Sequence, residues 1–150
     1  MKTSIIQLYS RELDTLASEI EQYQHEVSLW KVTPQISNCG GNLCLHLIGN
    51  LHHFIGKYIG NTDYIRKRDL EFSTKDVPKT TLLSEISTVK HTVISSLENF
   101  PADQFHENYA IEKNGEIVTN ELMLLHLLTH LSYHIGQINY HRRLLDVLDC

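Results

Sequence analysis

The sequence has few cysteines, and they are not arranged as a metal or disulfide framework. Its 150 residues include only Cys39, Cys44 and Cys150, and no two of them have the C-x-x-C spacing of zinc-binding or redox motifs. An odd number of cysteines without that spacing favours free thiols in a reducing compartment over a set of disulfides. We therefore expect a cytoplasmic protein without disulfide bonds.

Long apolar runs and an excess of basic residues are also missing. No segment approaches the roughly 20 apolar residues that a transmembrane helix needs. Charged residues from Arg11 onward interrupt the first segment, so we expect neither a signal peptide nor a membrane partner. The net charge is −5, and lysine and arginine are scattered rather than clustered. The lack of a basic stripe argues against a nucleic-acid partner.

The apolar residues that are present recur at helical spacing in four segments. Hydrophobic residues make up 41% of the chain, enough for one globular domain over residues 1–150. Spacings of three and four predict amphipathic helices over residues 3–26, 43–59, 82–99 and 121–143. Four helices with one apolar face each can bury those faces only against one another. The sequence therefore predicts an all-α protein, a four-helix bundle.

Polar segments with turn residues separate the predicted helices. Asn42, Thr80 or Thr81, and Thr119 or Asn120 are suitable N-caps for the second, third and fourth helices. Residues 62–79 read as a polar loop. The pair Asn114-Gly115 lies between two short alternating runs within residues 109–118, and this pattern predicts a small two-stranded hairpin between the third and fourth helices.

Histidines are concentrated in two of the predicted helices. In the fourth, His126, His130 and His134 recur every four residues, and Gln137 and His141 continue the same band. At about 100° per residue this band borders the apolar face of the helix. Imidazoles one turn apart can therefore converge on one metal ion.

We expect a third metal ligand from the second predicted helix. His46, Asn50 and His53 share one of its faces, whereas His52 lies well off that face. The residues alone leave two ligand sets open: His46 or His53, each together with His130 and His134.

Two other kinds of metal site do not fit the sequence. A zincin helix needs a glutamate directly after its first histidine, and that position is Leu131 after His130. A di-iron bundle needs Glu-x-x-His pairs on two helices, and the second and fourth helices have none. The sequence shows no Ser-His-Asp set, and we expect no carboxylate base near the histidines.

Two segments resemble motifs of the DinB-like family. THLSYHIGQI at residues 129–138 looks like that family's fourth-helix motif, roughly N-H-x-x-Y-H-R-G-Q, with Ile135 in place of its arginine. LCLHLIGNLHHFIG at residues 43–56 resembles its second-helix element, although Asn50 stands where relatives often have an acidic residue. HLIGN followed by RDLEF at residues 68–72 is similar to one uncharacterised branch of the family.

The resemblance implies an antiparallel four-helix bundle, often a homodimer, that holds a divalent ion such as zinc or nickel. It carries the ligand roles to His46, His130 and His134, and so selects His46 over His53. Some members of the family resemble thiol-dependent S-transferases and isomerases that use bacillithiol or mycothiol. His126, Gln137 and Asn50 are the candidates for auxiliary roles at such a site: a further ligand, a proton carrier or a group that orients a ligand.

Three neutral imidazoles would leave at least one coordination position open. We therefore expect a metal-dependent transferase acting with a low-molecular-weight thiol, or a hydrolase, in either case on a small electrophilic substrate. The alternatives are a dimeric bundle in which metal serves stability or sensing without catalysis, and a structural dimer whose histidines bind nothing.

Overall fold

The computed structural model describes residues 1–147, which form five α-helices and no β-strand. The all-α class predicted from the sequence is therefore confirmed for this part of the chain. The helices are α1 (Lys2–Glu21), α2 (Gly40–Leu51), α3 (Arg68–Ser73), α4 (Lys79–Asn99) and α5 (Asn120–Leu145). Two 3₁₀ turns, Glu26–Trp30 and Ala102–His106, lie in the connections.

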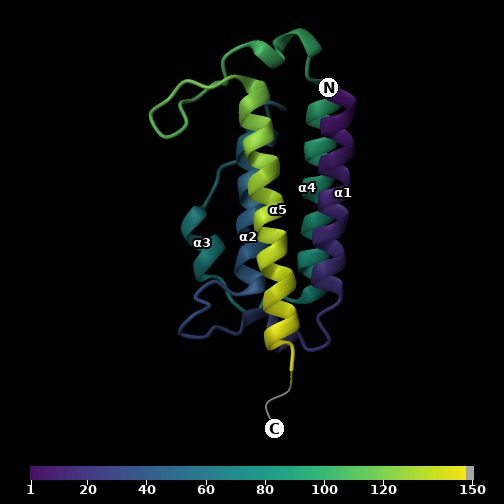
Figure 1. Cartoon of the computed structure of the whole chain (residues 1–150), viewed down its shortest axis with the longest axis vertical. Coiled ribbons are helices and arrows are strands. Elements are labelled where there is room, and N and C mark those ends of the chain that lie inside the picture. The colour runs from purple at the N-terminus through teal and green to yellow at the C-terminus, as the bar shows by residue number, and fades with distance from the viewer. Residues whose placement is uncertain (148–150) are drawn as a thin grey trace.

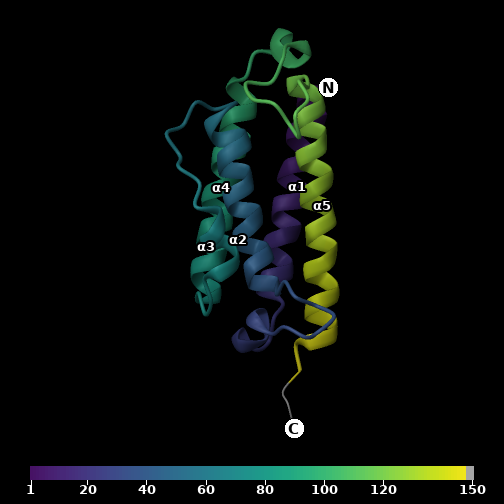
Figure 2. The same ribbon diagram turned by 90° about the vertical axis from the view of Figure 1, so that its left-hand side faces the viewer.

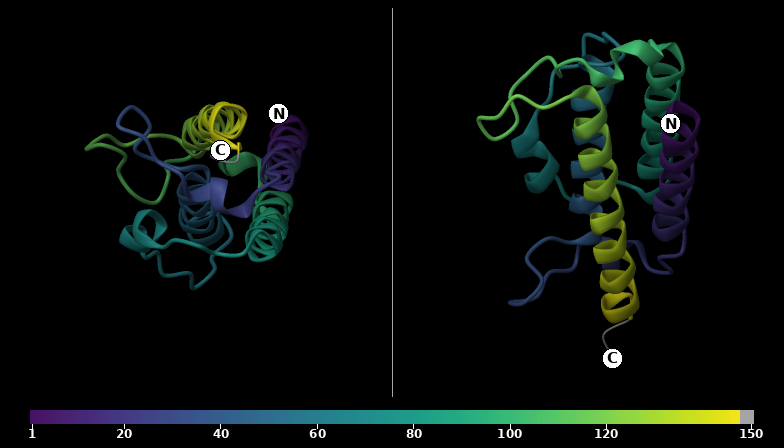
Figure 3. Two further views of the ribbon diagram at one scale, coloured as in Figure 1. Left: turned by 90° about the horizontal axis from the view of Figure 1, so that it is seen from below. Right: turned by 45° about the horizontal axis from the view of Figure 1, so that its top comes forward.

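The four long helices lie side by side around one apolar core (Figures 1 and 2). Helices α1 and α2 each pack against both α4 and α5, whereas α3 packs against the outer side of α2 (Figure 3). Every long helix contributes fully buried leucine or valine side chains, among them Leu13, Leu47, Val89 and Leu131. Burying one such side chain contributes about 1.5–3 kcal/mol, so this shared core holds α2 and α5 in a defined register.

A buried hydrogen bond adds to this packing where α1 crosses the first turns of α5. The hydroxyl of Tyr9, which is completely buried, donates to the carbonyl oxygen of Leu124 at 2.6 Å. Burial raises the pKa of Tyr9 well above its ordinary value, so the hydroxyl keeps its proton and acts as the donor. This bond connects the first helix to the one that carries the histidine row.

Several helix boundaries differ from the sequence-based predictions. Helix α1 ends at Glu21 rather than near residue 26, and α2 begins at Gly40, so Asn42 lies inside the helix instead of capping it. The side chain of Asn42 instead donates to the carbonyl oxygens of Glu71 and Thr74, because both approach it from the α3 segment. The predicted cap of α5 is confirmed: the hydroxyl of Thr119 accepts from the amide of Leu122.

The cap predicted for the third helix was wrong, and one helix was not predicted. Helix α4 begins at Lys79 after Pro78 and has no side-chain cap, so neither Thr80 nor Thr81 caps it. The polar loop expected over residues 62–79 contains α3, a six-residue helix that rests on α2. A helix this short has too few periodic positions to be recognised in a sequence, and its stability comes from tertiary packing.

Helix α2 continues into a π-helical turn at His52–Lys57. The amide of Gly60 donates to the carbonyl of Ile55, five residues earlier, which is the hydrogen bond that defines a π turn. The carbonyl of Phe54 accepts a hydrogen bond at 2.7 Å from the hydroxyl of Tyr109, in the segment before α5. Single π turns of this kind often lie at functional sites.

The hairpin expected over residues 109–118 is present only as a turn with isolated bridges. Asn114 and Gly115 have positive φ angles of 52° and 82°, as a two-residue hairpin turn requires. Paired hydrogen bonds join Lys113 to Glu116, and Tyr109 bonds to Val118, but no regular strand forms on either side. The segment projects away from the long helices beside the first turns of α5 (Figure 1).

Both cysteines in the described residues, Cys39 and Cys44, are free and buried, as predicted; Cys150 lies outside those residues. Burial raises the pKa of the Cys44 thiol, so it is no nucleophile and packs as a small apolar side chain.

Candidate metal centre

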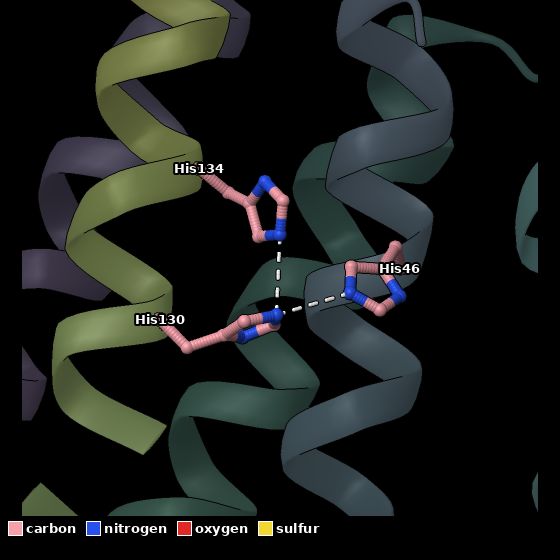
Figure 4. Close-up of side chains that lie close together, drawn as sticks. All are labelled: His46, His130 and His134. Carbon is pink, nitrogen blue, oxygen red and sulfur yellow. Dashed lines mark hydrogen bonds between the residues drawn. The ribbon is translucent and has the colours of Figure 1, made fainter. Parts of the chain in front are cut away.

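Three histidines from two helices point toward one another between α2 and α5. His46 lies on α2, and His130 and His134 lie one turn apart on α5 (Figure 4). The Nε2 atom of His130 is 3.2 Å from that of His46 and 3.1 Å from that of His134. One ring nitrogen from each residue lies within 4.8 Å of the other two, so the cluster could hold a metal ion.

The spacing of these nitrogens matches what zinc coordination requires. Tetrahedral zinc with bonds of about 2.0–2.1 Å to imidazole places its ligand nitrogens roughly 3.3–3.4 Å apart. Two of the three pairs are within a few tenths of an ångström of that value. Without an ion, Nε2 of His130 could form a hydrogen bond with only one of the two neighbouring Nε2 atoms at a time, since a single ring nitrogen either donates or accepts.

The outer nitrogen of His46 contacts a buried carboxylate. Its Nδ1 atom lies 3.0 Å from Oε1 of Glu71 in α3, and the exposed fractions of the two side chains are 8% and 7%. Nδ1–H therefore donates to the carboxylate, and the lone pair of Nε2 is left facing the two α5 histidines. This carboxylate–imidazole pair is the arrangement that usually orients a metal-binding histidine.

Glu71 is in turn held by an arginine. The guanidinium of Arg66 donates to both carboxylate oxygens, at 2.8 Å each. Burial alone would raise the pKa of Glu71, but the hydrogen bonds from Arg66 and His46 outweigh it and hold the pKa below its usual value. The carboxylate therefore stays ionised and keeps its place against His46.

A glycine on α2 makes room for this carboxylate. A Cβ atom on Gly49 would overlap the carboxylate of Glu71, so any larger residue there would displace it. Glu71 had not been identified from the sequence as a neighbour of the histidines. Glu71 is 25 residues from His46 in sequence, and only the packing of α3 on α2 brings them together. Its one sequence signal was its place in the RDLEF segment, which the family resemblance had already singled out.

The other two histidines have different surroundings. Nδ1 of His134 lies 2.6 Å from Oε1 of Gln137, so Gln137 contacts a candidate ligand, as its spacing suggested. Nδ1 of His130 is buried and has no hydrogen-bond partner within residues 1–147. Hydrogen bonds at Nδ1 therefore orient two of the three rings, those of His46 and His134.

The cluster favours neutral imidazoles. Burial, together with the proximity of His134 and His46, lowers the pKa of His130 to about 4. Burial also lowers the pKa of His134, although its hydrogen bond with Gln137 opposes the shift. Both rings are therefore unprotonated at neutral pH, and their lone pairs are available to a cation.

The remaining candidate residues lie beside the cluster rather than in it. The rings of His126 and His130 have centroids 6.5 Å apart and planes inclined by 29°, and Asn50 is buried one turn beyond His46. His53 packs edge-on against Phe54 and Tyr58, and it is not part of the three-histidine group. His52 stacks on Tyr64, away from the cluster, as the helical spacing predicted.

Fold and site together define an all-α protein with a cluster of three histidines able to hold a metal ion. Residues 3–148 match the model of the family described as "Protein of unknown function (DUF1572)", and the chain belongs to this family. No curated protein matches the chain. Among residues 1–147, none of the helices has both the length and the hydropathy to cross a bilayer.

Proposed function

We propose that this chain is a DinB-like metal protein whose ligands are His46, His130 and His134. In this proposal α1, α2, α4 and α5 are the four-helix bundle of that family, and the bound ion is zinc or nickel. The convergence of three Nε2 atoms at near-coordination spacing is the observation that carries the proposal. The buried Glu71–Arg66 pair behind His46 supports it, because such outer contacts accompany metal-binding histidines.

The proposed reaction is transfer of a low-molecular-weight thiol to a small electrophile, or hydrolysis of that electrophile. A divalent ion held by three uncharged imidazoles would keep its positive charge and lower the pKa of a bound thiol or water. Glu71 would hold His46 in the productive tautomer. It is not free to act as a base, since Arg66 and His46 occupy both its oxygens. His126, whose ring centroid lies 6.5 Å from that of His130, would carry protons.

Metal analysis of untagged protein tests the site. After supplementation with zinc or nickel we expect one ion per chain, lost in His134→Ala and kept in the matched control His52→Ala, which alters a histidine outside the cluster. Absence of any ion from the unaltered protein rejects the proposal. Equal loss in His52→Ala shows that the α2 ligand has been assigned to the wrong face.

Turnover separates catalysis from a stabilising or sensing role for the metal. If the protein is an enzyme, a thiol and 1-chloro-2,4-dinitrobenzene should react faster in the presence of the metal-loaded protein than in the presence of protein whose metal a chelator has removed. The alternative function, a metal-stabilised or metal-sensing bundle, is favoured by the fact that the cluster joins α2 to α5. If this alternative holds, removal of the metal by a chelator should lower the melting temperature, and no thiol should give turnover. Turnover that survives complete metal removal contradicts the mechanism.

We further propose that the protein is a cytoplasmic homodimer that pairs through the outer face of α5. Five large apolar side chains on that face have exposed fractions between 38% and 65%. They are Leu122, Leu125, Tyr133, Tyr140 and Leu144. A row of this length on a monomer is typical of an interface. Light scattering should give twice the chain mass, and Tyr140→Glu should give the monomer; a monomeric unaltered protein contradicts the proposal.

A further inference from the structure

A cavity of about 400 Å³ lies directly beside the histidine cluster. Its walls come from the end of α2, from α5 and from the segment that projects before α5. The apolar part of the lining includes Phe54, Ile111 and Met123. A volume in this range suits a small molecule or one end of a larger one.

The helix directions place the cavity one turn from the cluster. Asn50 follows His46 by four residues on α2, and His126 precedes His130 by four on α5. Because α2 and α5 run in opposite directions (Figure 1), both steps lead toward the same end of the bundle. One turn rises about 5.4 Å, so Asn50 and His126 lie roughly that far from the point where the imidazoles meet, and His130 joins the cavity to the cluster.

Several residues that line this cavity carry a buried polar atom without a hydrogen-bond partner. Residues 1–147 contain four such side-chain atoms. Three of them, Asn50 Oδ1, His53 Nδ1 and His130 Nδ1, belong to residues that line this cavity. The side chain of Asn50 is only 6% exposed. Buried polar groups in folded proteins nearly always have partners, and an unsatisfied one costs about 1–3 kcal/mol, so three at one cavity indicate a missing ligand.

We propose that this cavity is a substrate subsite for an uncharged group that both donates and accepts a hydrogen bond, as a carboxamide does. Asn50 Oδ1 is an acceptor and needs an N–H donor. His130, when its Nε2 binds a metal, carries its hydrogen on Nδ1 and needs an acceptor such as a carbonyl oxygen. The apolar lining then takes the methylene or methyl groups on either side of the amide.

The wall that carries Asn50 and His53 is held in place by the segment opposite. The hydroxyl of Tyr109 donates to the carbonyl of Phe54 at 2.7 Å, within the π-helical turn that contains His53. Tyr109 is itself buried, and burial raises the pKa of its hydroxyl, so it remains a donor. The projecting segment and the π turn therefore form a largely preformed cavity.

This inference rests on the proposed metal site, and two thiols test it. The probes are N-acetylcysteamine, which carries an amide two methylenes from sulfur, and 1-pentanethiol, which has methylenes in its place. Binding is followed in the cobalt(II)-loaded protein through the thiolate-to-cobalt absorption band. The measured quantity is the ratio of the two dissociation constants, so effects common to both thiols cancel.

We expect Asn50→Leu to reduce the preference for N-acetylcysteamine about tenfold, the effect of one lost hydrogen bond. Asn50→Asp keeps the acceptor and should retain most of the preference. Asn99→Leu, at an exposed position on α4, is the matched control and should change nothing. In the unaltered zinc protein, the Asn50 side-chain amide signals should shift with N-acetylcysteamine more than with 1-pentanethiol.

The results can reject the substrate subsite without rejecting the metal site. No cobalt band at all rejects the metal site and the subsite together. A cobalt band with the same thiol ratio in unaltered protein and Asn50→Leu, or equal shifts of the Asn50 signals with both thiols, leaves the metal site standing and overturns the subsite. Water would then be the partner of these buried atoms.

Discussion

Glu71→Gln is the change that tests how the site is organised. Gln keeps the size of the side chain and an oxygen that can accept from His46, but it removes the negative charge that Arg66 and His46 share. Loss of an outer partner of a metal-binding histidine typically lowers metal affinity 10–100-fold. Because one hydrogen bond to His46 can persist, we expect about a tenfold loss of zinc affinity, near the lower end.

Glu71→Ala should have a larger effect, for two reasons. It removes the acceptor for His46 altogether, so we expect about a 100-fold loss of zinc affinity. It also leaves the guanidinium of Arg66 without its carboxylate, with a side chain only 12% exposed. Removing one member of a buried ion pair costs about 3–5 kcal/mol, so the metal-free protein should also unfold more easily.

Competition with a chromophoric chelator at pH 7 measures the affinities, and urea unfolding of the metal-free proteins measures the stabilities. Glu98→Gln, at an exposed position on α4, is the matched control and should change neither. Unchanged zinc affinity in both Glu71 variants would refute the orienting role. A loss in Glu71→Gln as severe as in His46→Ala would show that Glu71 is itself a ligand.

Four further predictions follow from individual contacts and pKa shifts. Gly49→Ala should lower zinc affinity about as much as Glu71→Gln, about tenfold, because its Cβ displaces the Glu71 carboxylate; equal affinity in the competition assay contradicts this. Tyr9→Phe should lower the free energy of unfolding by about 1 kcal/mol through loss of the bond to Leu124, measured by urea unfolding, with metal content unchanged. The pKa of His130 is lowered to about 4 and that of His134 is lowered too, so protons compete only weakly with zinc for these two rings. Zinc should therefore remain bound as the pH falls from about 6.5 toward about 5. Zinc release centred near a pH of about 6.5 contradicts this. The same pKa shifts predict that the metal-free protein loses stability as the pH falls below about 6.5. In that range the histidines of the unfolded chain bind protons, whereas His130 and His134 of the folded chain remain unprotonated.

The sequence predicted the long helices well and the contacts between distant segments poorly. Apolar spacing identified the segments that became α1, α2, α4 and α5, because each buries one continuous face. It missed α3, which is short and polar and is stabilised by resting on α2. It also missed the π turn, which changes the helical register at His52 and His53, just after α2 ends.

The histidine row on α5 could be read from the sequence, but its partner on α2 could not be chosen from spacing alone. His46 and His53 share a face of an ideal helix, yet they are about 10 Å apart along its axis. Only one of them can meet His130 and His134, and the packing of α2 against α5 decides which. The family resemblance had selected His46, and His46 is the residue that the structure brings into the cluster.

The outer contacts of the site were the least predictable part. Arg66 and Glu71 lie in the segment predicted to be a polar loop, and their burial depends on where α3 rests. The unpartnered atoms of Asn50, His53 and His130 appear only once three separate segments surround one cavity.

A crystal structure of the zinc-loaded protein, with data collected at the zinc absorption edge, tests the central claim most directly. We expect one anomalous peak about 2.0–2.1 Å from the Nε2 atoms of His46, His130 and His134. No peak between these rings, or a peak held instead by His53 or His126, would contradict the proposed centre.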